Sequence, residues 1–182
     1  MINTEQVLPW HEVEASVVKE KKWLREVFDF SEFERGRDLQ NLPISLDEML
    51  RQISVSIVRG DIKVKELKSK QANSLWVDDV TNLEQFENDE YHGSEWHRKM
   101  MTIIKSHFIE NGFEVVNEPY LNQGRSDLGV YKENYPNLFV EVGTTSLYKS
   151  WINLHTMPQS IFLFVPSEYY ALEFQNSVAF AI

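Results

Sequence analysis

The stretch Gly124–Thr145, GRSDLGVYKENYPNLFVEVGTT, contains two short apolar runs on either side of a polar turn. Each run contains one carboxylate, Asp127 in the first and Glu141 in the second. Successive side chains of a strand point to opposite faces, so the register of a hairpin decides which residues oppose each other. A turn that is symmetric about Asn134 predicts that Asp127 lies directly opposite Glu141, on the same face of the sheet.

Two carboxylates in this arrangement repel each other unless a cation neutralises them. Mg²⁺ prefers oxygen ligands, and it commonly takes one or two carboxylates and keeps several waters. The pattern therefore predicts that Asp127 and Glu141 share a divalent cation. Glu118, which precedes Pro119 in the run before, is a third candidate ligand. The alternative for Asp127 is a turn residue after Gly124.

The segment 94–113, SEWHRKMMTIIKSHFIENGF, has an apolar stripe at helical spacing and ends in Asn111-Gly112, a common helix stop. His97 lies on the flank of this stripe, so we expect it to approach the sheet as a ligand or proton-transfer group, with a packing role as the alternative. Glu95 projects nearly opposite the stripe, which makes it the weaker metal candidate.

Strand-like and helical runs alternate through the second half of the chain. A helix is followed by three strand-like runs, a second helix and a short apolar run, at 94–113, 113–121, 126–131, 138–143, 144–154 and 160–166. This order predicts an α/β fold with a central mixed β-sheet flanked by helices.

The first half is predicted to be mostly helical. Helices are expected over 12–28 and 45–58, with Ser45 as an N-cap, while 61–68 fits either a strand or a continuing helix. The acidic run 78–94 is the predicted boundary. We therefore divide the chain into a helical N-terminal extension, residues 1–90, and a second domain, residues 91–182. No motif in the extension indicates a function, and a protein partner is left open for it.

The span from His97 to Gly143 resembles the core of the PD-(D/E)XK, or restriction-endonuclease-like, superfamily. That pattern is a helix bearing an acid or His, a strand, a strand with Asp, a turn, and a strand with Glu-x-Lys. Asp127 and Glu141 match the motif acids, and the likeness extends over residues 92–165. The resemblance implies a Mg²⁺- or Mn²⁺-dependent nuclease that cleaves DNA or RNA, with DNA favoured. It also implies the Val142 backbone carbonyl as a metal ligand.

One position departs from the pattern, because Gly143 stands where the motif Lys is expected. Some members of the superfamily supply this Lys from the following helix, and Lys149 is the obvious substitute here. A Lys at the site would position the attacking water and stabilise charge on the phosphate. Arg125, close to Asp127, is expected to contact substrate phosphate as a forked donor.

Composition limits the other classes of function. The 182 residues include no Cys, so disulfides, thiolate metal sites and Cys nucleophiles are excluded. No signal-peptide pattern and no run of 18 apolar residues occurs, which predicts a soluble, cytoplasmic protein without a membrane partner. The net charge of -10 disfavours nonspecific attraction to nucleic acid.

Two alternatives to a nuclease remain at this point. The first is a nuclease-fold adaptor that has lost catalysis and binds nucleic acid or protein, which Gly143 and the acidic charge favour. The second is an interaction protein whose hairpin acids face solvent and whose C-terminal segment 169–182 is an apolar contact surface. A homodimer is also left open, because many such nucleases pair to cut both strands.

Overall fold

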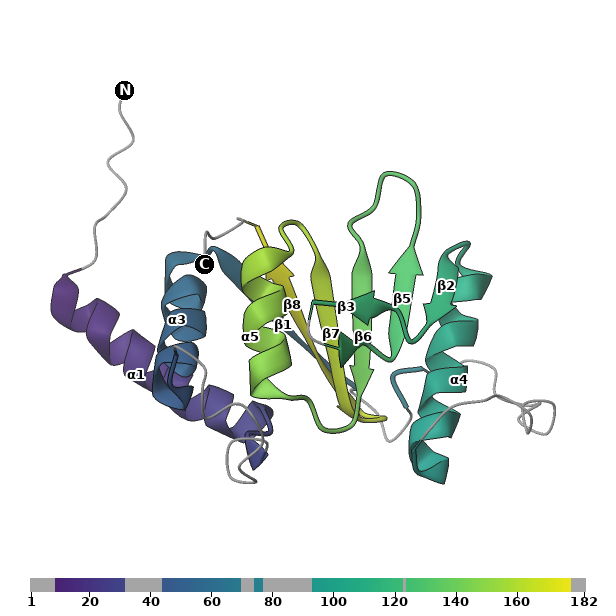
Figure 1. Cartoon of the computed structure of the whole chain (residues 1–182), viewed down its shortest axis with the longest axis horizontal. Helices are drawn as coiled ribbons and strands as arrows, with labels where there is room; N and C mark the ends of the chain where they lie inside the picture. Colours follow the sequence, from purple (N-terminus) through teal and green to yellow (C-terminus); the bar gives the residue numbers. More distant parts are fainter. Residues whose placement is uncertain (1–8, 32–43, 70–73, 77–92, 123, 178–182) are drawn as a thin grey trace.

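A mixed six-stranded sheet forms the centre of the molecule. The computed structural model describes residues 9–31, 44–69, 74–76, 93–122 and 124–177 (Figure 1). The sheet consists of β1 (Ile62–Lys68), β2 (Glu114–Asn117), β5 (Leu128–Tyr131), β6 (Leu138–Val142), β7 (Ile161–Ser167) and β8 (Tyr170–Asn176). Its order is β1-β8-β7-β6-β5-β2. Strands β6 and β7 are parallel, and the other neighbouring pairs are antiparallel.

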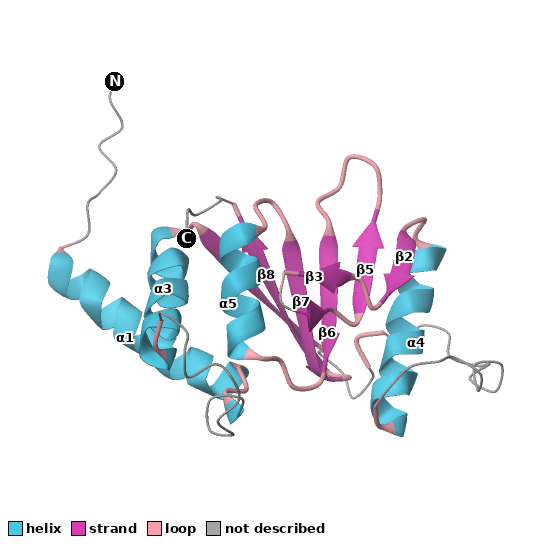
Figure 2. Cartoon of the chain, viewed as in Figure 1, coloured by secondary structure: helices cyan, strands magenta, loops and turns pink. Residues whose placement is uncertain are grey.

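A separate two-stranded hairpin pairs β3 (Tyr120–Leu121) with β4 (Gly124–Arg125). Four longer helices accompany the strands: α1 (Trp10–Val27), α3 (Leu46–Arg59), α4 (Glu95–Glu110) and α5 (Leu147–Thr156) (Figure 2). The prediction of an α/β fold with a mixed sheet flanked by helices is confirmed. Among the described helices, none has both the length and the apolar character needed to cross a membrane.

The helices cover the two faces of the sheet unequally. Phe162 and Phe164 of β7 belong to one buried cluster together with residues of α1, α3 and α5. Leu163 and Val165 of the same strand belong to a second cluster with residues of α4. Because side chains alternate along a strand, these clusters lie on opposite faces. The molecule is therefore a three-layer arrangement with the sheet in the middle.

The predicted helix ends are confirmed at several places. The Ser45 hydroxyl accepts a hydrogen bond from the backbone N–H of Glu48 at 3.2 Å and caps α3. The Ser94 hydroxyl caps α4 in the same way, through the backbone N–H of His97. At its other end α4 stops at Glu110, and Asn111 is its C-cap.

The sheet extends across the boundary predicted at residue 90. The ambiguous segment 61–68 contains β1, which pairs along its whole length with β8. Leu24 of α1 and Ile53 of α3 are buried in the same core cluster as Phe174 of β8. The helices of the predicted extension thus share a core with the C-terminal half. Of the predicted boundary run, residues 77–92 lie outside the described part of the chain.

The C-terminal segment differs from its prediction as an apolar contact surface. Residues 170–176 form β8, which lies between β1 and β7 in the sheet. Its apolar side chains Leu172 and Phe174 are buried because both strand edges are paired and helices cover their face. Residues 178–182 lie outside the described residues.

Candidate active site

The register of the β5–β6 hairpin agrees with the predicted symmetry about Asn134. Leu128 pairs with Val140 and Val130 with Leu138. Asp127 lies one residue before the first paired residue of β5, and its charge is close enough to Glu141 to raise the pKa of that carboxyl group. The turn between the strands contains Asn134 with a φ of +64°, a conformation that Asn tolerates better than most residues.

Asp127 is held at the end of the hairpin by three contacts. Its backbone N–H donates to the Val140 carbonyl at 3.0 Å. Its Oδ2 accepts a hydrogen bond of 2.6 Å from the backbone N–H of Val142. The same oxygen lies 3.3 Å from Nε2 of His97, in the first turn of α4. The structure therefore brings His97 to the acid pair, and Val142 takes part through its N–H, whereas the prediction concerned its carbonyl.

Glu141 is nearly enclosed, with 14% of its side chain exposed. It lies on the same face of β6 as buried Phe139, toward α5. Burial raises the pKa of Glu141 to about 7, the Lys149 ammonium opposes this rise, and the Asp127 carboxylate adds to it. Glu141 consequently changes protonation near neutral pH, as groups in functional sites often do.

Lys149 reaches the acid pair from α5. Its Nζ lies 3.3 Å from Oε1 of Glu141 and donates to the Arg125 carbonyl at 2.7 Å. A β carbon at Gly124 would meet Cε of Lys149 at 3.6 Å, an ordinary van der Waals contact, so the lysine stem passes close to this strand. The Lys149 ammonium thus lies between the β3–β4 hairpin and the buried carboxylate of Glu141.

Gly143 has a backbone reason to be glycine. Its φ is +86°, in the left-handed region that disfavours residues with a β carbon. Space is not the cause, because the nearest atom to a β carbon there would be Cζ3 of Trp96 at 3.8 Å. A Lys at position 143 would be strained, and this explains why the cation comes from α5.

Glu118 and Arg125 are engaged with each other. Nη1 of Arg125 lies 3.0 Å from Oε2 of Glu118, which follows β2 and has a φ of +46°. The Arg125 side chain is 64% exposed and therefore available to an approaching phosphate. Glu95 is the exposed first residue of α4. The structure thus gives Glu118 an arginine partner and leaves Glu95 at the surface.

The metal ion that the resemblance implies would need oxygen ligands close to one another at this site. Within the described residues, no three His, Cys, Asp or Glu side chains are clustered so that they could hold a metal ion. Asp127 and Glu141 remain as a pair, and Mg²⁺ or Mn²⁺ sites that rely on one or two carboxylates complete their shell with water and substrate oxygens. The pair fits that chemistry, while the larger set with Glu118 and Glu95 is not assembled.

Two contributors were missed in the sequence. The Ser126 hydroxyl is buried, donates to the Val140 carbonyl at 2.8 Å, and lowers the pKa of Glu141. Asn122 joins the β3–β4 hairpin to α5 by donating to Asn153 Oδ1 and Thr156 Oγ1, at 3.1 and 2.7 Å. Ser126 directly precedes the motif Asp, which is a usable signal, whereas nothing in the sequence pairs Asn122 with α5.

Comparisons with known proteins found no relative of this chain. Models of protein families, curated proteins and solved structures were each compared with the chain, and none of them matches it.

Proposed function

We propose that this protein is a metal-dependent nuclease with a restriction-endonuclease-like core. The observation on which this depends is the convergence of Asp127, Glu141 and Lys149, which come from the start of β5, from β6 and from α5. Two acids that repel each other and one lysine fit the needs of phosphodiester hydrolysis, in which a cation and an ammonium stabilise a charged phosphate.

The connectivity around the site supports the same proposal. The chain runs through α4, β2, the β3–β4 hairpin, β5, β6, α5 and β7; Asp127 directly precedes β5, and Glu141 lies in β6. Strand β7 then returns parallel to β6 after the helix that bears Lys149. This is the order of helix, strands and turn in the superfamily pattern described above.

Each residue has a distinct role in the proposed reaction. Asp127 and Glu141 would hold the metal ion, which when bound acts as a Lewis acid and lowers the pKa of a bound water. Lys149 would orient the attacking water and stabilise the charge that builds on the phosphate. Because the pKa of Glu141 is about 7, its carboxylate is available as a ligand mainly above neutral pH. The Arg125 guanidinium would release the Glu118 carboxylate and bind a phosphate of the substrate backbone instead.

Cleavage assays with matched variants test the proposal. Plasmid DNA and a structured RNA are incubated with Mn²⁺ at pH 8, with wild type, Asp127→Asn, Glu141→Gln and Lys149→Gln. We expect each variant to lose cleavage by about 10²- to 10⁴-fold. Lys65→Gln, at an exposed lysine of β1, is the control and should cut like wild type. Equal cleavage by all variants, or none by wild type on either substrate, would overturn the proposal.

The inactive adaptor is the second candidate, and the ion pair itself favours it. Lys149 neutralises Glu141 without a metal, and the lysine is further satisfied by the Arg125 carbonyl. An adaptor would bind nucleic acid equally well in EDTA and in Mn²⁺ and would cut neither substrate. The same assays, with a gel-shift measurement added, separate the two candidates.

A further inference from the structure

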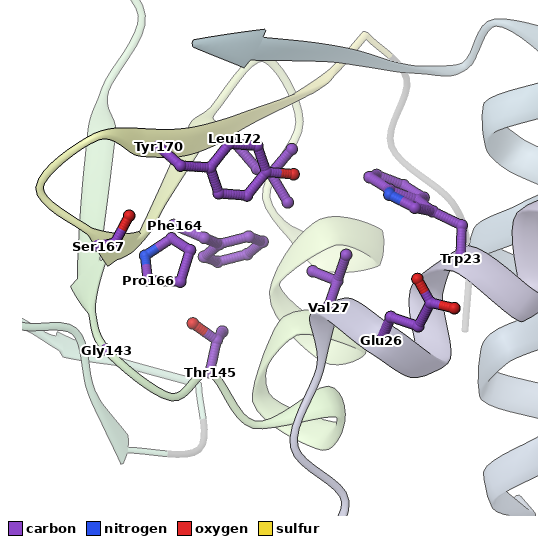
Figure 3. A pocket seen from close by; sticks show the side chains of 10 residues that line it. All are labelled: Trp23, Glu26, Val27, Gly143, Thr145, Phe164, Pro166, Ser167, Tyr170 and Leu172. Atoms are coloured by element: carbon purple, nitrogen blue, oxygen red, sulfur yellow. The ribbon is translucent and has the colours of Figure 1, made fainter. Parts of the chain in front are cut away.

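A pocket of about 370 Å³ lies at the carboxyl ends of β6 and β7 (Figure 3). Trp23 of α1 and Phe164 and Tyr170 of the β7–β8 hairpin provide aromatic walls. The loop between β6 and α5 contributes Thr145, and Glu26 stands on the α1 side. The pocket therefore combines ring faces with a few polar groups, as small-molecule sites do.

This pocket adjoins the candidate active site. Phe164 is the register partner of Glu141 in the parallel β6–β7 pair, so the two side chains are neighbours on one face of the sheet. Gly143, two residues after Glu141, also lines the pocket. A group bound there would lie one strand away from the acid pair.

A buried hydroxyl points into the pocket. Thr145 is only 4% exposed, and its Oγ1 has no hydrogen-bond partner among the described residues. Figure 3 shows this hydroxyl directed toward Phe164 and Pro166. An unpaired buried hydroxyl is unfavourable, and a ligand with a polar edge would relieve it. Ser167 and Glu26 supply further oxygens along the wall.

We propose that the pocket binds one unpaired nucleobase of the substrate, from a nucleotide beside the phosphate that is cut. This inference rests on the proposed nuclease function. A base has two apolar faces for the aromatic walls and a polar edge for Thr145. The Glu26 carboxylate only accepts hydrogen bonds, so the edge of the base that faces it carries an N–H donor, such as the exocyclic amino group of adenine or cytosine. A base inside a duplex cannot enter, so the substrate is single-stranded at this position or has its base flipped out.

Binding is measured with an oligonucleotide that contains 2-aminopurine, in Ca²⁺ so that bound substrate is retained. We expect the single strand to bind wild type with quenching of the 2-aminopurine fluorescence, and the same strand in a full duplex to show none. Thr145→Val should weaken single-strand binding about fivefold, while Thr145→Ser keeps the hydroxyl and should bind like wild type. Because Thr145→Val removes an unpaired hydroxyl, it should fold at least as stably as wild type.

A second measurement separates this inference from the nuclease proposal. Adenosine alone is titrated against wild type and Thr145→Val by nuclear magnetic resonance without metal. Binding that Thr145→Val weakens supports the pocket, even if neither plasmid nor RNA is cut. If cleavage depends on Asp127 but Thr145→Val binds 2-aminopurine strands and adenosine like wild type, the base pocket is overturned and the nuclease stands. Equal quenching in the duplex would also overturn it.

Discussion

The ammonium of Lys149 lies 3.3 Å from a carboxylate oxygen of Glu141, and the two residues reach this contact from α5 and β6. The contact links three features of the sequence. The Arg125 carbonyl accepts a second hydrogen bond from the lysine, and Gly143 has a backbone conformation that disfavours a lysine directly after β6. The cation of the site is therefore supplied by the helix, and the properties of Glu141 depend on it.

Glu141→Gln should stabilise the metal-free protein at alkaline pH. Folding raises the pKa of Glu141 from its ordinary value of 4.5 to about 7, so the folded state binds more protons than the unfolded state between these values. Wild-type stability should consequently fall as pH rises from about 4.5 to about 7 and then stay level. The isosteric amide removes this loss, up to about 3 kcal/mol at pH 8.

Urea denaturation in EDTA at pH 4.5, 6 and 8 measures this effect. Glu114→Gln, at an exposed acid of β2, should follow wild type at all three pH values. A Glu141→Gln variant that is less stable than wild type at pH 8 would show that the Lys149 ion pair outweighs the burial of the carboxylate.

A lysine at position 143 should destabilise the protein. Gly143→Lys forces a residue with a β carbon to a φ of +86°, which costs about 1–2 kcal/mol. Gly143→Asn is the matched control and should cost less, because Asn tolerates this conformation. Thermal denaturation compares the two variants. The double variant Gly143→Lys, Lys149→Gln should not recover cleavage, and recovery would show that a strand lysine can replace Lys149.

Mn²⁺ should stabilise the protein at pH 8. The cation relieves the repulsion between Asp127 and Glu141 and favours the ionised form of Glu141, which lowers the pKa of this group. At a concentration one hundred times the Kd the gain is about 2.7 kcal/mol, equivalent to a Tm increase of roughly 5–10 °C for a chain of this size. Differential scanning fluorimetry with Mn²⁺ and with EDTA measures the shift.

Variants identify the ligands in that experiment. Asp127→Asn should abolish the Mn²⁺ shift. Glu118→Gln should keep it, since the Glu118 carboxylate is occupied by Arg125 at 3.0 Å. A shift that disappears in Glu118→Gln would instead place Glu118 among the ligands.

The N-terminal helices should be necessary for folding of the C-terminal half. Phe174 of β8 is fully buried, and its ring contacts Trp23 and Phe28 at centroid distances of 6.0 and 5.8 Å. Phe174→Ala should cost about 3–5 kcal/mol. A fragment of residues 91–182 should lack cooperative unfolding, because it loses β1 and these contacts. Circular dichroism melts of the fragment and of the full chain decide this, and a cooperative melt of the fragment would support an independent domain.

Local patterns in the sequence determined several parts of the site. The apolar stripe and the Asn111-Gly112 stop define α4 and place His97 in its first turn. Period-two alternation around a turn centred on Asn134 defines the β5–β6 hairpin and brings Asp127 close to Glu141. These features could be predicted because each depends on residues that are close together in the chain.

Only the tertiary structure decided the remaining features. The pairing of β1 with β8 joins segments that are far apart in the sequence, Ile62–Lys68 and Tyr170–Asn176, and the alternation in 61–68 does not indicate which strand is its partner. Glu118 turns toward Arg125, and Lys149 turns toward Glu141, although local spacing allowed other directions for each. The physical reason is that long-range strand pairing and the direction of a charged side chain follow from packing and burial across the whole fold, which local periodicity does not specify.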